Sequence, residues 1–337
     1  MYIIIGASSF IGVYTATYFL ERGENIVVTG RNDRFKNYYA RFKNAQYVNL
    51  DLNNPEDFNI LPKEKVEGVI LISGLLPASE NADLQEQENS DMYIMTNTLG
   101  TIYTLEYCRK NGIKRLINTV SFADVANQLT LDPPIDEKVP RDFKFAGDHA
   151  VYVISKNAAT DIMKYYNEQH GMKNAWFRLP PVYGVGPHGY LNVNGEIVKS
   201  GLQIFIDKAT EGEDIEVYGY LARDIVYVKD VAKAYYLAAQ NVKTQGLYNI
   251  TSGRATTLLE QAKICAEIFA RDKTHQSKII YREDIVNDGK SYLFSIEKAK
   301  KDFGYEPDYA DFKELMIDYK KELDKGQYLK LFASRAV

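Results

Sequence analysis

The sequence predicts an α/β fold in which a doubly wound parallel sheet is followed by a smaller C-terminal α+β part. Short apolar segments alternate with helix-like segments through the first half of the 337-residue chain, which is typical of parallel sheets. The first apolar segment ends in a glycine-rich turn that leads into a helix. From about residue 180 a stretch rich in Pro, Gly and Tyr breaks the alternation. Strands that are apolar throughout indicate a sheet covered on both faces.

The elements follow in order along the chain. The predicted strands are residues 1–5, 25–29, 46–50, 68–73, 115–119 and 175–179, which are short, apolar and rich in β-branched residues. The predicted helices between them are residues 10–22, about 93–111 and 150–169, each ended by a glycine. The C-terminal part should contain helices at 199–210, 258–270 and 312–325 and a strand at 213–219.

Composition and charge narrow the possible partners. The 41 basic and 45 acidic residues give a net charge of −4 without a strongly basic segment, so neither nucleic acid nor an anionic membrane is an expected partner. Two cysteines are too few for a disulfide scaffold, and the four scattered histidines do not indicate a metal site. Residues 1–20 are uncharged, but Gly, Ser and Thr dilute them too much for a membrane span. We therefore expect a cytoplasmic protein that binds small molecules.

The turn after the first predicted strand indicates a dinucleotide-binding site. It has the sequence Gly-Ala-Ser-Ser-Phe-Ile-Gly, and a turn at this place presents backbone N–H groups and a helix N-terminus to a pyrophosphate. The expected cofactor-binding residues here are Gly6, Ser8, Ser9, Phe10, Ile11 and Gly12. Ser9 stands where such folds usually have a glycine. The alternative is a glycine turn that only packs the helix against the strand.

The end of the second predicted strand favours NADP over NAD. Gly30 occupies the place where NAD-binding folds carry Asp or Glu against the ribose hydroxyls. Arg31 follows directly and can pair with a 2′-phosphate, with Asn32 beside it. The alternative for Arg31 is a solvated surface side chain. Asp51 and the neighbouring Leu52 follow the third strand, where they are expected to contact the adenine.

Tyr152, Lys156 and Ser121 are the candidate catalytic residues. Tyr152 and Lys156 are four residues apart in a predicted helix, so they share one face, and a nearby ammonium lowers the pKa of a phenol. Tyr39 and Lys43 have the same spacing in what we expect to be a surface helix, so the spacing alone is weak evidence. Ser121 strengthens the assignment because it follows a strand at the carboxyl edge of the sheet, where ligands bind.

Taken together, these motifs resemble the extended short-chain dehydrogenase/reductase family, which has a Rossmann fold and includes nucleotide-sugar epimerases, dehydratases and reductases. The matching stretches are GASSFIG, VNLDL, TNTLGTIYTLEYCRKNGIKRLINTVS, YVISK, FRLPPVYGVG, RDIVYVKDVAKA, LYNITSG and SIEKAKKDFGYEP, in the order of the family. The family implies that residues 1–179, with 222–252 returning, form the dinucleotide-binding domain. Residues 180–221 and 253–330 would form the substrate-binding domain.

The resemblance also implies further site residues. Ser121 would hydrogen-bond the reacting oxygen, Tyr152 would relay its proton, and Lys156 would lower the pKa of Tyr152 and hold the nicotinamide ribose. The remaining residues implied at the cofactor are Ser73, Gly74, Leu75, Asn97, Pro180, Pro181 and Val182. Arg223 would bind a substrate phosphate, and its alternative is a surface ion pair with Asp224. Phe122 and Ala123 stand where sugar dehydratases carry Asp and Glu, which argues against a dehydratase.

The main hypothesis is an NADP-preferring oxidoreductase that reduces a keto group of a nucleotide-linked sugar, with Tyr152 as general acid. The principal alternative is a nucleotide-sugar 4-epimerase with tightly bound NAD. Two further possibilities are a non-catalytic dinucleotide sensor and an enzyme acting on a simple aldehyde or ketone, for which Arg223 would be superfluous. The family also suggests a homodimer formed through the helices at 93–111 and 150–169. The identity of the sugar depends on loops 76–92, 122–148 and 184–200.

Overall fold

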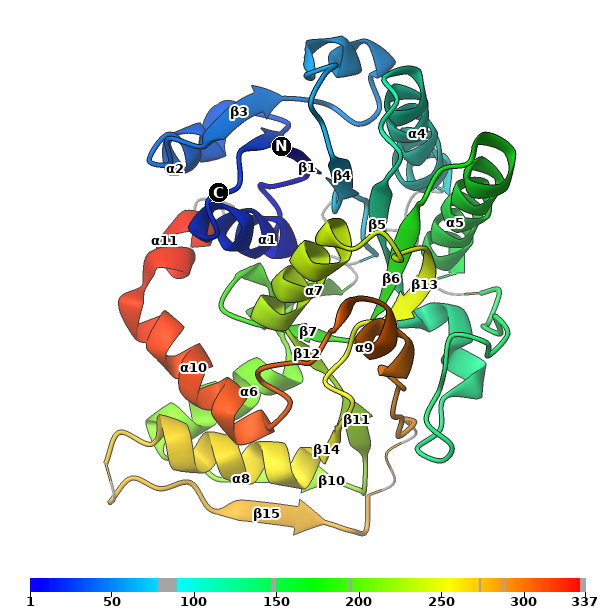
Figure 1. The fold of residues 1–337 in the computed structure, drawn as a ribbon. Helices are drawn as coiled ribbons and strands as arrows, with labels where there is room; N and C mark the ends of the chain where they lie inside the picture. Colours follow the sequence, from blue (N-terminus) through cyan, green and yellow to red (C-terminus); the bar gives the residue numbers. More distant parts are fainter. Residues whose placement is uncertain are drawn as a thin grey trace.

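The computed structural model describes residues 1–77, 90–146, 150–193, 196–272, 274–285, 287 and 289–333. Within these ranges a seven-stranded parallel sheet forms the centre of the molecule, in the order β13-β6-β5-β4-β1-β2-β3 (Figure 1). The strands are β1 Tyr2–Ile5, β2 Ile26–Gly30, β3 Ala45–Asn49, β4 Gly68–Leu71, β5 Leu116–Ser121, β6 Ala175–Leu179 and β13 Gly246–Asn249. The predicted fold class is confirmed.

The direction of winding reverses beside β1. The chain runs from β1 to β2 and β3 on one side, then crosses to β4, β5 and β6 on the other. Ligands of open α/β sheets bind in the crevice at such a reversal, at the carboxyl ends of the strands. The glycine-rich turn after β1 and the ends of β4 and β5 therefore border one crevice.

Helices cover both faces because successive strand residues point to opposite sides. Ile4 belongs to the core shared with α1 (Phe10–Glu21) and α7 (Val228–Gln240). Ile3 and Ile5 belong to the core shared with α4 (Gly100–Lys110) and α5 (Ala150–His170). In Figure 1, α4 and α5 lie side by side on the right, and α1 and α7 lie in front of the sheet.

The helix expected at 93–111 is not one regular helix. It consists of α3 (Ser90–Tyr93), a π-helical segment (η3, Ile94–Leu99) and α4. A π turn adds one residue to the helix, a change that hydrophobic periodicity does not reveal. The segment contains Asn97, one of the predicted site residues.

The expected surface position of Tyr39 is wrong. Tyr39 ends the short helix α2 (Lys36–Tyr39), which follows the 3₁₀ segment η1 (Asp33–Phe35), and its side chain is fully buried. Its hydroxyl donates a hydrogen bond of 2.6 Å to the carbonyl oxygen of Ala7 in the glycine-rich turn. Tyr39 therefore helps to hold the backbone of the glycine-rich turn in place.

The C-terminal part packs beneath the carboxyl edge of the sheet (Figure 1). Its helices are α6 Gly201–Glu211, α8 Leu258–Phe269, α9 Glu297–Phe303, α10 Phe312–Lys325 and α11 Gln327–Ala333. Its strands form the pairs β7 Val182–Tyr183 with β12 Val226–Tyr227, β8 Tyr190–Val193 with β9 Glu196–Lys199, β10 Ile215–Tyr218 with β15 Ile279–Arg282, and β11 Ala222–Asp224 with β14 Ala255–Thr257. The chain returns to the sheet through α7 and β13. The remaining short segments are the 3₁₀ turns η2 Pro55–Ile60, η4 Phe122–Gln128 and η5 Pro187–Gly189.

The exact domain boundaries stay a prediction. No helix among the described residues combines the length and the hydrophobicity needed to cross a membrane.

Candidate active site

Two glycines of the turn after β1 are required by close packing. Gly6 has a φ of +90°, and a Cβ there would lie 2.5 Å from the backbone nitrogen of Ser73. A Cβ on Gly12 would clash with the carbonyl oxygen of Gly6. The Gly6 N–H donates to the hydroxyl of Thr29 at 3.2 Å, which fixes the turn against β2.

Ser9 is compatible with the turn although such folds usually have glycine there. Its backbone is extended, with a φ of −81°, so glycine is not needed for conformation. Its Oγ donates to the carbonyl of Gly6 at 2.7 Å and accepts from the N–H of Gly12 at 3.1 Å. Ser9 is therefore the N-cap of α1 and closes the turn on itself.

The next two residues have different surroundings. The side chain of Phe10 is only 2% exposed and fills the space beside Gly184 and Gly186, so only its backbone N–H can face a phosphate. The side chain of Ile11 lines the large cavity described below.

The predicted adenosine-binding residues lie at the ends of β2 and β3. Arg31 is exposed, and among the described residues its guanidinium has no hydrogen-bond or ion-pair partner. The side chain of Asn32 accepts from the N–H of Arg34 at 3.1 Å and caps η1. Asp51 is exposed, whereas Leu52 is buried against Gly100 and can offer mainly its backbone.

Asn97 connects the end of β4 with α5. Its side-chain oxygen accepts from the N–H of Leu75 at 2.8 Å, and its amide donates to the carbonyl of Leu75 at 3.1 Å and to Oγ of Ser155 at 3.0 Å. A Cβ on Gly74 would lie 2.8 Å from Nζ of Lys156 and 2.9 Å from Oδ1 of Asn97. Ser73, Gly74 and Leu75 are thus held directly against the helix that carries Lys156.

Two of the three candidate catalytic residues, Ser121 and Tyr152, meet at the carboxyl edge of the sheet, and Lys156 lies one helical turn further along and next to Gly74. Ser121 is the last residue of β5, and Tyr152 and Lys156 lie on α5. The expected lowering of the Tyr152 pKa is wrong: burial raises this pKa above its usual value, the charge of a nearby tyrosine adds to the rise, and a hydrogen bond with Ser121 opposes it. Burial lowers the pKa of Lys156 to about 8, and its ammonium has no ion-pair partner among the described residues.

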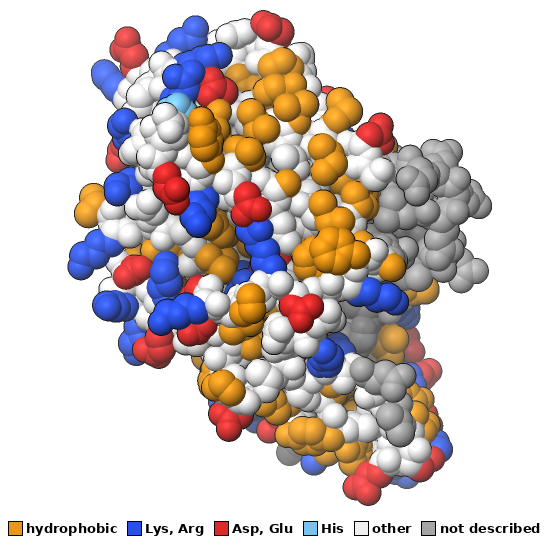
Figure 2. Space-filling view, turned by 90° about the vertical axis from the view of Figure 1, so that its right-hand side faces the viewer, with side chains coloured by type: hydrophobic (Ala, Val, Ile, Leu, Met, Phe, Trp, Pro, Cys, Tyr) orange, Lys and Arg blue, Asp and Glu red, His pale blue; other side chains and the backbone are white. Residues whose placement is uncertain are grey.

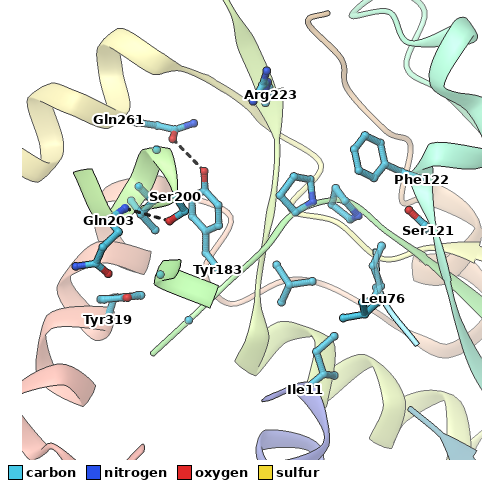
Figure 3. Close-up of a pocket in the computed structure, with 18 of the residues that line it drawn as sticks. Ile11, Leu76, Ser121, Phe122, Tyr183, Ser200, Gln203, Arg223, Gln261 and Tyr319 are labelled. Carbon is cyan, nitrogen blue, oxygen red and sulfur yellow. Dashed lines mark hydrogen bonds between the residues drawn. The ribbon is translucent and has the colours of Figure 1, made fainter. Parts of the chain in front are cut away.

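A cavity of about 550 Å³ begins at this group and extends into the C-terminal part (Figure 3). Ser121, Tyr152, Pro180, Pro181 and Val182 line it near the sheet. At its other end it is lined by polar side chains and the start of α6, namely Tyr183, Ser200, Gln203, Arg223, Gln261, Asn287 and Tyr319. The volume is within the range of small-molecule sites.

Arg223 lies at the cavity and does not pair with Asp224, so the alternative of a surface ion pair between them is wrong. Asp224 is fully buried and accepts hydrogen bonds from both the N–H and the Oγ of Ser252, at 3.1 and 2.7 Å, and from the N–H of Phe294. Burial raises the pKa of Asp224 to about 7. A Cβ on Gly289 would lie 2.9 Å from Nη2 of Arg223, so glycine at 289 leaves room for the guanidinium.

The comparisons with known proteins agree with this geometry. The profile of the NAD dependent epimerase/dehydratase family matches residues 2–251. The chain belongs to this family. Its membership confirms the resemblance drawn from the sequence and the prediction of an NAD(P)-dependent enzyme.

Relatives and solved structures of the family align along nearly the whole chain. A putative UDP-glucose 4-epimerase of Methanocaldococcus jannaschii is 27% identical over 326 residues, which cover 93% of this chain and 95% of that protein. A UDP-glucose 4-epimerase of Pisum sativum is 25% identical and covers 91% of each chain. A UDP-N-acetylglucosamine 4-epimerase from Methanobrevibacter ruminantium shares the fold with a TM-score of 0.76 at 19% identity, covering 97% of this chain and 98% of that one.

The residues present fit the dinucleotide that the family name implies. The ammonium of Lys156 is buried and has no acidic partner among the described residues. It lies next to Gly74, whose lack of a side chain leaves space beside Nζ. Such a donor suits the hydroxyl groups of a ribose. Arg31 is a second cation without a partner in the described part of the chain, at the end of β2.

The sequence did not reveal the polar end of the cavity. Tyr183, Gln203, Gln261 and Tyr319 come from separate parts of the family's C-terminal region. Tyr183 donates a long hydrogen bond of 3.4 Å to Gln261, and burial raises the pKa of Tyr183 to about 12 against the opposing charge of Arg223 (Figure 3). At this end only Tyr183 and Arg223 lie in stretches that match the family, and no local motif marks Gln203, Gln261 and Tyr319.

Proposed function

We propose that the protein is an NADP-preferring reductase that acts on the keto group of a nucleotide-linked sugar. The observation that carries the proposal is that Ser121 and Tyr152 lie at one end of the cavity and Arg223 lines it further on. Ser121 and Tyr152 can thus transfer a proton at one end of the cavity, and the guanidinium of Arg223 can bind an anion further along it. When bound, the nicotinamide supplies the hydride.

Each residue of the catalytic group has a separate task. The hydroxyl of Tyr152, like any phenol, is protonated at neutral pH and serves as the proton donor. Ser121 donates a hydrogen bond that polarises the carbonyl oxygen. Lys156 supplies the positive charge that stabilises the phenolate left after proton transfer, and it holds the nicotinamide ribose.

The substrate assignment rests on the polar end of the cavity. Arg223 suits a phosphate or diphosphate because its guanidinium can make two parallel hydrogen bonds. The N-terminus of α6 also lines the cavity and offers the backbone N–H groups of Gly201 and Leu202, since those of Ser200 and Gln203 already donate to the carbonyl of Gly189 and to Oγ of Ser200. The relatives named above, which act on UDP-sugars by their descriptions, support the same substrate class.

A 4-epimerase with tightly held NAD is the second candidate. The names of the relatives favour it, and a solved UDP-glucose 4-epimerase of Thermus thermophilus, which contains NAD, shares the fold at 22% identity with a TM-score of 0.69. In this mechanism Ser121 and Tyr152 would remove and return the proton of one hydroxyl group, and a bound NAD would supply the reversible hydride acceptor. Gly30 and Arg31 favour the reductase because they replace the usual carboxylate with a cation.

The first experiment is to release any dinucleotide retained on purification, identify it by mass spectrometry, and titrate the stripped protein with NADPH and NADH. Near-stoichiometric NAD would support the epimerase and contradict the NADP preference. An empty site that prefers NADPH, together with NADPH consumption equimolar to a keto-sugar nucleotide, would support the reductase.

Tyr152→Phe separates an enzyme from a dinucleotide sensor. Removal of the hydroxyl should lower kcat by at least about 10²-fold, since the proton donor is lost, while the Kd for NADPH stays unchanged. Unchanged turnover would contradict the assignment of Tyr152. Absence of turnover in the unsubstituted protein with every keto-sugar nucleotide would favour the sensor.

We also propose a homodimer formed through the face of α3, η3 and α5. Figure 2, which looks onto the side of α4 and α5, shows hydrophobic side chains gathered in a band. Exposed apolar residues of these elements are Met92, Ile94, Met95, Ile154 and Tyr165. An apolar face of this kind on a helix pair is typical of a protein interface.

A further inference from the structure

Tyr47 occupies the space in which a side chain of residue 30 would lie. Gly30 ends β2, and a Cβ there would clash with the hydroxyl of Tyr47 on β3 and lie 3.1 Å from Oγ of Ser8. NAD-binding folds place a carboxylate at this point to bind the ribose hydroxyls. Here a tyrosine hydroxyl from the neighbouring strand excludes it.

The same hydroxyl fixes the backbone next to Arg31. It donates a hydrogen bond of 2.6 Å to the carbonyl of Asn32. On the other side of Arg31, the carbonyl of Gly30 accepts from the N–H of Leu50 at 3.0 Å. The backbone is therefore held before and after Arg31, while its guanidinium has no partner among the described residues.

The ring of Tyr47 connects this segment to the glycine-rich turn. It stacks on Tyr39 with a centroid distance of 5.9 Å and an interplanar angle of 22°. Tyr39 in turn donates its 2.6 Å hydrogen bond to the carbonyl of Ala7. The two tyrosines thus join the turns after β1 and β2, on which the phosphates of a dinucleotide rest in this kind of fold.

We propose that Tyr47 is a specificity-determining residue for the cofactor. It excludes a carboxylate from position 30 and holds the backbone around Arg31, so that the guanidinium faces a phosphate on the 2′-oxygen of the adenosine ribose. The inference rests on the proposed NADP preference. Selectivity between NADP and NAD would then depend on Tyr47 of β3 as well as on Gly30 and Arg31 at the end of β2.

The test measures binding of two cofactor fragments, 2′,5′-ADP and 5′-AMP, by calorimetry on the whole chain stripped of dinucleotide. Neither fragment contains nicotinamide, so the result does not depend on turnover. Tyr47→Phe keeps the ring and removes the hydrogen bond to Asn32. We expect the preference for 2′,5′-ADP to fall at least about fivefold, with the Kd for 5′-AMP unchanged.

Tyr38→Phe is the matched control. Tyr38 lies next to Tyr39 in α2, is also buried, and its hydroxyl bonds to Oγ1 of Thr17 at 3.0 Å. This variant loses a tyrosine hydroxyl from the same region without touching the 30–32 backbone, so it should keep the preference of the unsubstituted protein.

Gly30→Asp tests the steric part of the inference. In the unsubstituted background the new side chain meets the Tyr47 hydroxyl, and binding of both fragments should weaken. In the Tyr47→Phe background the atom nearest to the new side chain is removed and only the looser contact with Ser8 remains, so 5′-AMP binding should recover and the preference should turn toward 5′-AMP. If Gly30→Asp weakens 5′-AMP binding equally in both backgrounds, Tyr47 does not exclude the carboxylate and the inference is wrong.

Two results separate this inference from the proposed function. If the unsubstituted protein binds 2′,5′-ADP no more tightly than 5′-AMP, the NADP preference fails, and the inference with it. If the unsubstituted protein prefers 2′,5′-ADP and Tyr47→Phe keeps the same ratio, the NADP preference stands and the role of Tyr47 is refuted.

Discussion

Asp124 and Arg178 form a buried two-point ion pair, with Nε–Oδ1 and Nη2–Oδ2 distances of 2.9 Å. Asp124 lies three residues after Ser121, and Arg178 lies in β6 opposite Val120 of β5. The pair therefore joins the segment that follows Ser121, the candidate catalytic serine, to the strand that leads to Pro180. Neither side chain is exposed to water.

Asp124→Asn should destabilise the protein by about 3–5 kcal/mol, because the buried guanidinium of Arg178 loses the carboxylate that pairs with it directly and keeps only the charge of Glu137 nearby. Urea unfolding followed by fluorescence of Trp176, the single tryptophan and a residue of β6, measures the change.

The control for this variant is Asp284→Asn. Asp284 makes a similar two-point pair with Arg282, at 2.9 and 2.8 Å, but this pair is exposed, so its loss should change stability little. If the two substitutions lower the free energy of unfolding equally, burial of the Asp124–Arg178 ion pair does not determine its contribution to stability.

The activity should fall as pH rises above about 8. Burial lowers the pKa of Lys156 to about 8, so the ammonium that stabilises the Tyr152 phenolate is progressively lost above that pH. The value of kcat/KM for NADPH, which reports the ionisation of the free enzyme, should decrease through this range. Lys156→Arg keeps the charge and should move the decrease to higher pH. A profile that is unaffected by Lys156→Arg would assign the titration to another group.

The same pKa shift has a consequence for stability. Between pH 8 and 10.5 the unfolded chain holds a proton on Lys156 that the folded chain has released. The free energy of unfolding therefore rises with pH in this window, relative to a Lys156→Met variant. If the free energies of unfolding of the unsubstituted protein and of Lys156→Met differ by the same amount from pH 7 to 10, the pKa of Lys156 is not lowered.

Arg223→Ala should raise KM for a nucleotide-sugar substrate by about 10- to 100-fold, since a charge-assisted hydrogen bond to a phosphate is lost. The value of kcat should change less, because Arg223 and the reacting groups lie at different parts of the cavity. Steady-state kinetics give both values, and the Kd for NADPH serves as the control. An unchanged KM would point to a simple carbonyl substrate without a nucleotide.

Charge placed on the apolar face of α3, η3 and α5 should dissociate the proposed dimer. The double substitution Met95→Glu and Tyr165→Glu buries two carboxylates in the interface, so sedimentation velocity should show a monomer. Val242→Glu, at a residue that is 82% exposed and distant in sequence from these helices, should leave the dimer intact. If the unsubstituted protein already sediments as a monomer, the dimer proposal is wrong.

Contiguous patterns in the sequence predict six of the seven strands of the central sheet and the first residues of the site, but they do not predict β13. The strand at 175–179 was predicted with its exact bounds, and the glycine turn, Ser121 and the Tyr152–Lys156 pair were found without a structure. These features depend on contiguous patterns: apolar runs, a turn between a strand and a helix, and a spacing of four on one helix. Such patterns can be recognised in the sequence because their physical causes act within a few residues.

Packing between segments that are far apart in the sequence produces the features that join distant parts of the chain. The hydroxyl of Tyr47 occupies the space where a side chain at position 30 would lie. The side-chain amide of Asn97, in the π-helical segment, hydrogen-bonds both Leu75 and Ser155. The polar end of the cavity likewise gathers residues from 183 to 319. Proximity of this kind is a product of packing in three dimensions, and no local propensity in the sequence encodes it.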